Sequence, residues 1–528
     1  MGTLIAWFFD QRERRRTLID GLILVAWLVL VGYQVVHHAM WRDEVRALSI
    51  ALHGNDFIAM LKGLHGEGHP AIWYLLLRGA YAFTCRVEVL AATAFLVGFA
   101  TVTLLIFRSP FPRPLVGLLV TGHAFLFEYS VMARNYGIAA LLFFLLALAY
   151  PRHRDRGVVL GILLFLLANT NVVAAILTAP FLLFWLLDIL KQTRWRWSPK
   201  LKNFALNSAI TMVGVALCAV TILPTYNDAQ AHDWSASSPV VAAFAAIINP
   251  GGTSQGALFA YLLPGFIGSA LLFASALGLW PRWPAVIAAV CGLVLCALFY
   301  GVAAAGAYRH AGMWLCFIIA LYWICWPELT TGDRLAWRPS SSMIAWGGRI
   351  AFLVIAAVQT AAGLNDLRVA LTPGMVASRS ADFGRLMASR PDLANAVIVT
   401  EPEYLAEALP YYVKNPTYLV REHAFGNVIK FSRHGRLESD LGETLAVSRD
   451  LQRSMGVPVL ILLSYRLDQI TPGLTYEEGE RWRTFRASAE QIREFAQATT
   501  MIKRFAPART NESFDVYLLG TEKPASES

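Results

Sequence analysis

Charged residues are scarce in this chain of 528 amino acids, and their scarcity excludes most soluble folds. Lysine, arginine, aspartate and glutamate make up only 15% of the sequence, whereas 56% of the residues are hydrophobic. A soluble protein of this length has no interior large enough to bury so much apolar surface. The apolar residues also form long runs, and the mean hydropathy is +0.49. We therefore expect a protein of the lipid bilayer.

Other familiar signals are also missing. The six cysteines lack the spacing of zinc ligands or of a redox pair, so they favour packing roles over a disulfide framework. The first apolar run, Thr17 to Val36, has no small-residue cleavage site after it, so we expect an uncleaved anchor. The polar C-terminal part contains no glycine-rich phosphate loop and no Ser-His-Asp spacing that would name a reaction.

Positive charge is present, at a formal net +9, but it is gathered in short clusters between the apolar runs. Such clusters mark cytoplasmic loops, which is a simpler explanation than a nucleic-acid partner. The segment Pro70–Thr84 is too short for a span and carries Arg78 in its middle, so we expect it to lie at the membrane interface. Only then do the clusters at 12–16, 152–156 and 191–202 all fall in the cytoplasm.

The resulting fold prediction is an all-α polytopic membrane domain over residues 1–364, with juxtamembrane helices in its first external loop. About eleven spans are expected, with a third at 114–128, a short fifth that ends before Asn169, and an eighth near 257–280. This odd number places the N-terminus in the cytoplasm and the C-terminal part outside.

Residues 365–528 have the composition of a soluble domain. Short apolar runs alternate there with helical patterns, which predicts a small extracytoplasmic α/β domain. The expected strands are 396–400, 416–420, 457–464 and 514–519, and the expected helices are 381–389, 441–454 and 488–499.

The first external loop begins with the motif W-R-D-E-V-R-A, directly after the first span. Neighbouring side chains on a helix point about 100° apart, so Asp43 and Glu44 cannot both face one atom. One of the two carboxylates can then act as a general base while the other braces the loop, and a flanking arginine can orient the base or hold a phosphate. The alternative is an interfacial cluster in which these charges only neutralise one another.

Three further motifs map to the same outer face. E-G-H-P contributes His69, A-R-N-Y-G-I contributes Arg134 and Tyr136, and A-Y-R-H-A-G contributes Arg309 and His310. A phosphate ester at this face would meet several cations. Each motif also has an ordinary explanation, since a loop histidine is commonly solvated and arginines at span ends commonly anchor a helix at the interface.

A metal site is the less favoured alternative for the loop. His65, Glu67 and His69 carry ligand atoms, but Gly66 and Gly68 between them prevent a rigid ligand face. No cofactor is firmly predicted, and a divalent metal stays open as the less favoured alternative.

Together these motifs resemble the GT-C glycosyltransferases, and within them the branch of protein O-mannosyltransferases and bacterial aminoarabinose transferases. Asp43, Glu44 and Arg46 match the D-E-x-R pattern of the latter. The segment Arg134–Tyr136 is similar to an arginine motif that opens the fourth span. A departure is His69, which stands where that group has a lysine before proline, and a neutral histidine binds phosphate less reliably than a fixed cation. The resemblance covers roughly residues 1 to 200.

This resemblance implies inverting transfer of one sugar from a polyprenyl-phosphate donor to a glycan, lipid or protein acceptor. The reaction would take place at the extracytoplasmic face of a bacterial plasma membrane, with Asp43 as general base and with Glu44 and Arg46 in support. The residues expected at the donor phosphate are His69, Arg134, Tyr136, Arg309 and His310. Two other functions remain open, namely a transporter or flippase of lipid-linked sugars and a non-catalytic envelope assembly or sensor protein.

Overall fold

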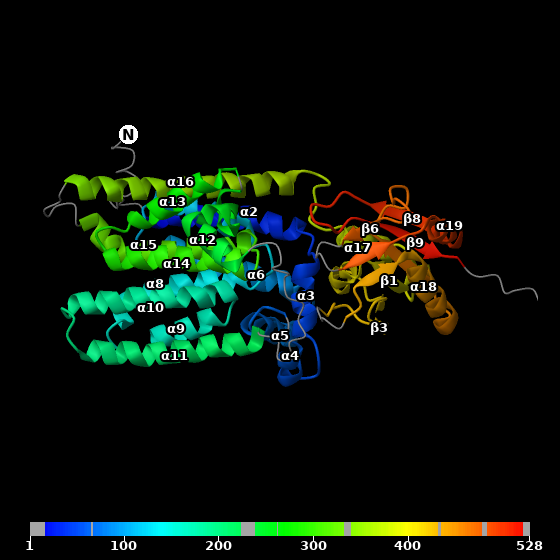
Figure 1. The fold of residues 1–528 in the computed structure, drawn as a ribbon, viewed down its shortest axis with the longest axis horizontal. Helices are drawn as coiled ribbons and strands as arrows, with labels where there is room; N and C mark the ends of the chain where they lie inside the picture. Colours follow the sequence, from blue (N-terminus) through cyan, green and yellow to red (C-terminus); the bar gives the residue numbers. More distant parts are fainter. Residues whose placement is uncertain are drawn as a thin grey trace, which may run out of the picture.

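The computed structural model describes residues 16–64, 67–222, 238–260, 262–331, 339–430, 435–477 and 483–520. A bundle of helices with similar directions forms one end of the molecule, and a domain containing β-strands forms the other (Figure 1). The predicted loop histidine His65 and most of the first basic cluster, residues 12–15, lie outside the described residues.

Eight helices in the described ranges are long and apolar enough to cross a membrane. In lipid, a helix satisfies all its backbone hydrogen-bonding groups internally, which is why such apolar runs become helices. This finding confirms a many-pass membrane protein. The eight helices are α2 (Arg16–His37), α6 (Val89–Arg108), α8 (Tyr136–His153), α10 (Val172–Gln192), α11 (Pro199–Ile222), α14 (Trp283–Val302), α15 (Tyr308–Thr331) and α16 (Pro339–Leu371).

The other three predicted spans are shorter helices in the same bundle. They are α7 (Arg113–Val120), which continues through the π-helical turn η1 (Ala124–Glu128), α9 (Val159–Ala168) and α13 (Gly265–Leu277). A ten-residue helix such as α9 is about 15 Å long, or half the thickness of the hydrocarbon core. α9 packs along α11, and α13 packs along α16. The predicted spans therefore correspond to eight full-length helices and three shorter ones. Between α11 and α13 lie α12 (Pro239–Ile248) and the short turns η2 (Pro250–Gly252) and η3 (Ser254–Phe259).

Three short helices follow the first span and lie between the bundle and the strand domain (Figure 1). They are α3 (Arg42–Ala51), α4 (Phe57–Gly63) and α5 (Ile72–Thr84). α5 has 13 residues, the same length as α13 and fewer than the roughly 20 of a full span, so the interfacial position of Pro70–Thr84 stays a prediction. The guanidinium of Arg78 donates to the carbonyl oxygens of Ala51 and His53 at 3.0 Å, and so satisfies backbone groups at the end of α3.

The C-terminal domain is built on a six-stranded sheet in the order β3-β2-β1-β5-β9-β8. β1 is parallel to β2 and to β5, with Val397 opposite Val459, whereas β9 is antiparallel to β5 and β8. β1 and β5 are buried along their whole length, which explains why both read as unbroken apolar runs. The strands of this sheet are β1 (Val397–Glu401), β2 (Thr417–Leu419), β3 (Ala424–Phe425), β5 (Val459–Leu463), β8 (Thr499–Phe505) and β9 (Phe514–Leu519).

A small second sheet, β4-β7-β6, and several helices complete this domain. All the predicted strands and helices of the domain are present within a few residues, so an α/β domain is confirmed. The span helix α16 continues to Leu371 and therefore crosses the expected domain boundary at residues 364 and 365. The remaining elements are β4 (Glu438–Asp440), β6 (Thr475–Glu477), β7 (Thr484–Arg486), α17 (Ser380–Ala388), η5 (Pro391–Leu393), η6 (Glu403–Tyr411), α18 (Leu441–Met455) and α19 (Ala489–Ala498).

The predicted orientation of the chain can be tested with its own cysteines, because Cys85 is the one exposed cysteine in the described part of the chain. Cys85 follows α5, so an impermeant thiol reagent should label it in sealed right-side-out membrane vesicles. The label should vanish in Cys85→Ser. A cysteine introduced in that background at the exposed Arg156, in the turn after α8, should react only after permeabilisation. Labelling of position 156 in sealed vesicles would overturn the orientation.

Candidate active site

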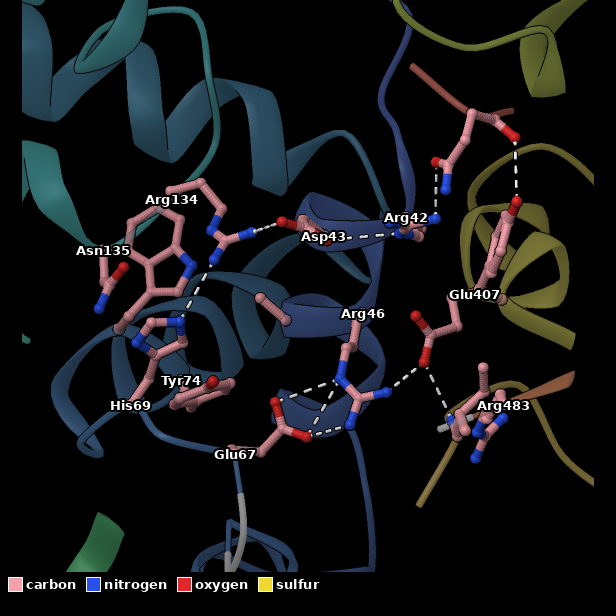
Figure 2. A pocket seen from close by; sticks show the side chains of 15 residues that line it. Arg42, Asp43, Arg46, Glu67, His69, Tyr74, Arg134, Asn135, Glu407 and Arg483 are labelled. Carbon is pink, nitrogen blue, oxygen red and sulfur yellow. Dashed lines mark hydrogen bonds and ion pairs between the residues drawn. The ribbon is translucent and has the colours of Figure 1, made fainter. Parts of the chain in front are cut away.

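Asp43 lies in the first turn of α3, and three arginines approach its carboxylate. Its Oδ2 is 2.6 Å from Nη1 of Arg134 and 3.3 Å from Nη2 of Arg309, while Oδ1 is 3.6 Å from Nε of Arg42. Arg134 stands in the loop before α8 and points at Asp43 (Figure 2). Arg309 stands in the first turn of α15. The fold thus brings together Asp43, Arg134 and Arg309, which the sequence placed on one face.

The arginines determine the charge of Asp43. Burial of the carboxylate raises its pKa, but the charges of Arg134, Arg309 and Arg42 outweigh this effect and lower the pKa to about 2. Asp43 is therefore ionised at every physiological pH. The same cations make it a weak base for as long as they face it.

Glu44 is fully buried and points away from this cluster. Its Oε1 accepts a hydrogen bond of 2.6 Å from the backbone N–H of Ala133, directly before Arg134. Its Oε2 accepts from the N–H of Trp41 at 3.2 Å and lies 2.8 Å from Nε2 of His38. Glu44 therefore ties the start of α3 to the loop that carries Arg134, an arrangement that fits the predicted bracing role.

Arg46 lies one turn further along α3 and is held between two carboxylates. Its Nε donates to Glu67 at 3.1 Å, and its Nη1 forms an ion pair with Glu407 of η6 (Figure 2). Glu407 also accepts a hydrogen bond of 3.0 Å from the N–H of Ile429. Arg46 thus links α3, the loop between α4 and α5, and the C-terminal domain.

His69 lies beside Arg134, with 3.2 Å between its Nε2 and Nη2 of the arginine. Because a guanidinium only donates, Nε2 accepts, and the ring proton is on Nδ1. That Nδ1 is buried and has no hydrogen-bond partner among the described residues. Burial lowers the pKa of His69 well below its usual value, and nearby Arg134, His310 and Arg309 lower it further. His69 is therefore a neutral hydrogen-bond donor.

Tyr136 and His310 form a second pair beside Arg309. Nε2 of His310 is 2.8 Å from the hydroxyl of Tyr136, while Nδ1 accepts from the N–H of Ala307 at 2.9 Å. His310 is thereby fixed as the Nε2–H tautomer, which donates to the tyrosine. These two side chains do not line the cavity described next, although they adjoin the arginine that contacts Asp43.

Asp43, Arg46 and Arg134 line a cavity of about 410 Å³ between the membrane domain and the C-terminal domain, whereas Arg309 and Glu44 do not line it. One wall comes from α3, the start of α5 and the loop before α8, and the other comes from the C-terminal domain. Nε1 of Trp73 in this cavity is also buried without a partner in the described part of the chain. The sequence analysis missed the second wall, which consists of Tyr404, Glu407, Ile429, Arg483 and Asn511.

Among the described residues, no group of three histidine, cysteine, aspartate or glutamate side chains is arranged to hold a metal ion. Of the three residues weighed as ligands, His65 lies outside the described ranges. Glu67 is engaged with Arg46, and His69 with Arg134.

No protein-family model matches this chain, and no curated protein sequence matches it. Among solved structures, it is similar to ArnT from Cupriavidus metallidurans bound to undecaprenyl phosphate, with 12% identity, a TM-score of 0.44 and coverage of 95% of this chain and 97% of that chain. It is also similar to ArnT from the same organism in the apo state, with 12% identity, a TM-score of 0.45 and the same coverage of both chains.

Replacement of Glu44 tests its bracing role. Glu44→Ala removes the acceptor for the N–H groups of Ala133 and Trp41, and each buried donor left unsatisfied costs about 1–3 kcal/mol. We expect a lower thermal unfolding midpoint for the purified protein, measured by intrinsic tryptophan fluorescence. Asp155→Ala, which breaks a surface ion pair with Lys200, is the matched control and should leave the midpoint unchanged. Equal midpoints for the two variants would contradict the bracing role.

Proposed function

We propose that the protein is a membrane glycosyltransferase that moves a sugar from a polyprenyl-phosphate donor to an acceptor at the extracytoplasmic face. The observation that carries this proposal is one ionised carboxylate, Asp43, which lines a cavity and is shared by Arg134 and Arg309. The cavity lies where the helix bundle meets the C-terminal domain. The proposal places the donor lipid along the helix bundle and the acceptor on the side of the C-terminal domain.

The donor phosphate fits the arginines better than any other group of the cavity. Asp43 faces three arginines, so this part of the site carries surplus positive charge, whereas Arg46 is already matched by two carboxylates. Guanidinium groups bind phosphate oxygens with strong, directional hydrogen bonds. A phosphate would therefore bind at Arg134 and Arg309 and not at Arg46. The buried Nδ1–H of His69 supplies a further donor, which supports a role for this residue with the phosphate.

Donor binding also changes Asp43. The phosphate competes with the carboxylate for Arg134 and Arg309, and the charge that lowers the pKa of Asp43 is then shared with a second anion. The pKa of Asp43 consequently rises towards that of an ordinary carboxyl group. The base gains strength when the donor is in place, which is the condition for general-base catalysis.

The proposed reaction is a single displacement. The acceptor oxygen attacks the anomeric carbon, its proton passes to Asp43, and the bond between that carbon and the phosphate oxygen breaks. The electron pair of this bond stays on the leaving polyprenyl phosphate, where Arg134 and Arg309 stabilise the new charge. The transferred sugar has inverted anomeric configuration, because the acceptor attacks the anomeric carbon on the face opposite to the departing phosphate. Asp43 returns its proton to water once the phosphate has left and the arginines face it again.

Asp43→Asn separates catalysis from binding. With a panel of polyprenyl-phosphate hexoses and pentoses, the variant should lose transfer by about 10²–10⁴-fold, as expected for removal of a general base. Donor affinity should stay equal or increase, since Arg134 and Arg309 lose a competing anion. Asp450→Asn, at an exposed position of α18, is the matched control. Transfer by Asp43→Asn at the normal rate would refute the base assignment, and movement of the lipid without sugar transfer in the wild-type protein would favour a flippase.

Arg134→Gln should instead weaken donor binding. Loss of a hydrogen bond from a charged group corresponds to about 1.5–3 kcal/mol, or roughly 10- to 150-fold in the dissociation constant.

For the wild-type protein, donor affinity should be constant between about pH 6 and 8, since the low pKa of His69 keeps its ring neutral throughout this window. The dissociation constant of the variant, and that of the wild-type protein across this pH range, can be measured by equilibrium binding of labelled donor. Affinity that falls as the pH rises would contradict a neutral His69.

A further inference from the structure

The N-terminus of α3 is held by a residue from the far end of the chain. Oε1 of Glu512 accepts a hydrogen bond of 2.9 Å from the backbone N–H of Arg42, across 470 positions of sequence. The first N–H groups of a helix have no partner within the helix, and an anion at this end also interacts favourably with the helix dipole. Trp41, which precedes the helix, makes no side-chain hydrogen bond to cap it.

The side chain of Arg42 is fixed by the same part of the C-terminal domain. Its Nη1 donates to Oδ1 of Asn511 at 2.8 Å, and its guanidinium lies 4.3 Å from the ring centroid of Tyr404. The residue directly before Asp43 is therefore held at its backbone by Glu512 and at its side chain by Asn511 and Tyr404.

The side chain of Glu512 is buried, and hydrogen bonds hold the loop that carries it. Its side chain is fully buried, and Oε2 has no hydrogen-bond partner among the described residues. Its carbonyl oxygen accepts from the N–H of Arg379 at 3.3 Å, and the hydroxyl of Thr510 donates to the carbonyl of Ala377 at 2.7 Å. The loop is thereby fastened to the segment that follows the span helix α16. Burial raises the pKa of Glu512 to about 7, so the fold keeps a carboxyl here at a cost in solvation.

We propose that Glu512 is a positioning residue, which fixes the first turn of α3 so that Asp43 faces Arg134 and Arg309. This inference rests on the proposed function of Asp43. Side chains on a helix change direction by about 100° per residue, so a small rotation of the first turn moves the carboxylate away from both arginines. Misplacement of a reacting group by about 1 Å can reduce a rate by a factor of about 100.

The test compares Glu512→Ala, which removes the acceptor, with Glu512→Gln, which keeps an oxygen at the same position. Leu445→Ala is the control for general loss of stability, because Leu445 is buried in α18 within the core of the C-terminal domain. Two experiments are made on the full-length protein in lipid nanodiscs: hydrogen exchange of the amides between residues 38 and 52, and steady-state kinetics of sugar transfer, which give kcat and donor KM.

We expect Glu512→Ala to accelerate exchange at the start of α3 by about tenfold or more and to lower kcat by about 10- to 100-fold, with less than about threefold change in KM. Glu512→Gln should restore the exchange rate and kcat to within about threefold of the wild type. Leu445→Ala should lower the unfolding midpoint without changing the exchange rate at the start of α3 or kcat.

Unchanged exchange in Glu512→Ala, or an equal response to Leu445→Ala, would overturn the inference. Faster exchange with an unchanged kcat would overturn it as well. A wild-type protein that transfers no sugar to any acceptor would count against the proposed function, and the exchange measurement would still decide whether Glu512 holds α3.

Discussion

The ion cluster of Asp43 with Arg134 and Arg309 is the contact on which the site depends. A charge removed from water is costly unless an opposite charge replaces the lost solvation, so the burial of each of these groups is compensated by the other two. Their side chains start from α3, from the loop before α8 and from the first turn of α15. The bundle must therefore fold with these elements in register for the charges to meet.

The C-terminal domain forms one wall of this site and also holds helix α3 in place. It contacts the start of α3 through Glu512 and the middle of the helix through Glu407. The hydroxyl of Tyr412 also donates to the carbonyl of Met40, two residues before α3, at 2.9 Å. The turn η6 that carries Glu407 follows the carboxyl end of β1, which lies between β2 and β5. In parallel sheets this end, where successive connections depart to opposite sides, is the usual place for a ligand. Here the turn η6, at this end of the sheet, forms part of a wall of the cavity.

The sequence predicted what depends on local pattern and on membrane physics. Apolar run length predicted the long helices, and the basic clusters placed Arg134 and Arg309 on the face of Asp43. The short length of Pro70–Thr84 and its arginine predicted a helix at the interface. The partners of Arg46 could not be predicted, since Glu407 is 361 positions away and nothing in either segment signals the other. β8 was missed for a different reason: most of its residues are exposed or half-buried, so it lacks the apolar run of a buried strand.

The resting ion cluster also bears on how the proposed enzyme would avoid wasteful hydrolysis. While Arg134 and Arg309 face Asp43, its pKa of about 2 makes it unable to accept a proton from water at neutral pH. In the proposed mechanism, basicity appears only when a donor phosphate binds the arginines, in a cavity that the C-terminal domain bounds. Exclusion of water then depends on the wall that Tyr404 and Asn511 form and on the acceptor itself. In this mechanism, the domain that fixes the first turn of α3 is also the one that decides which hydroxyl group reaches Asp43.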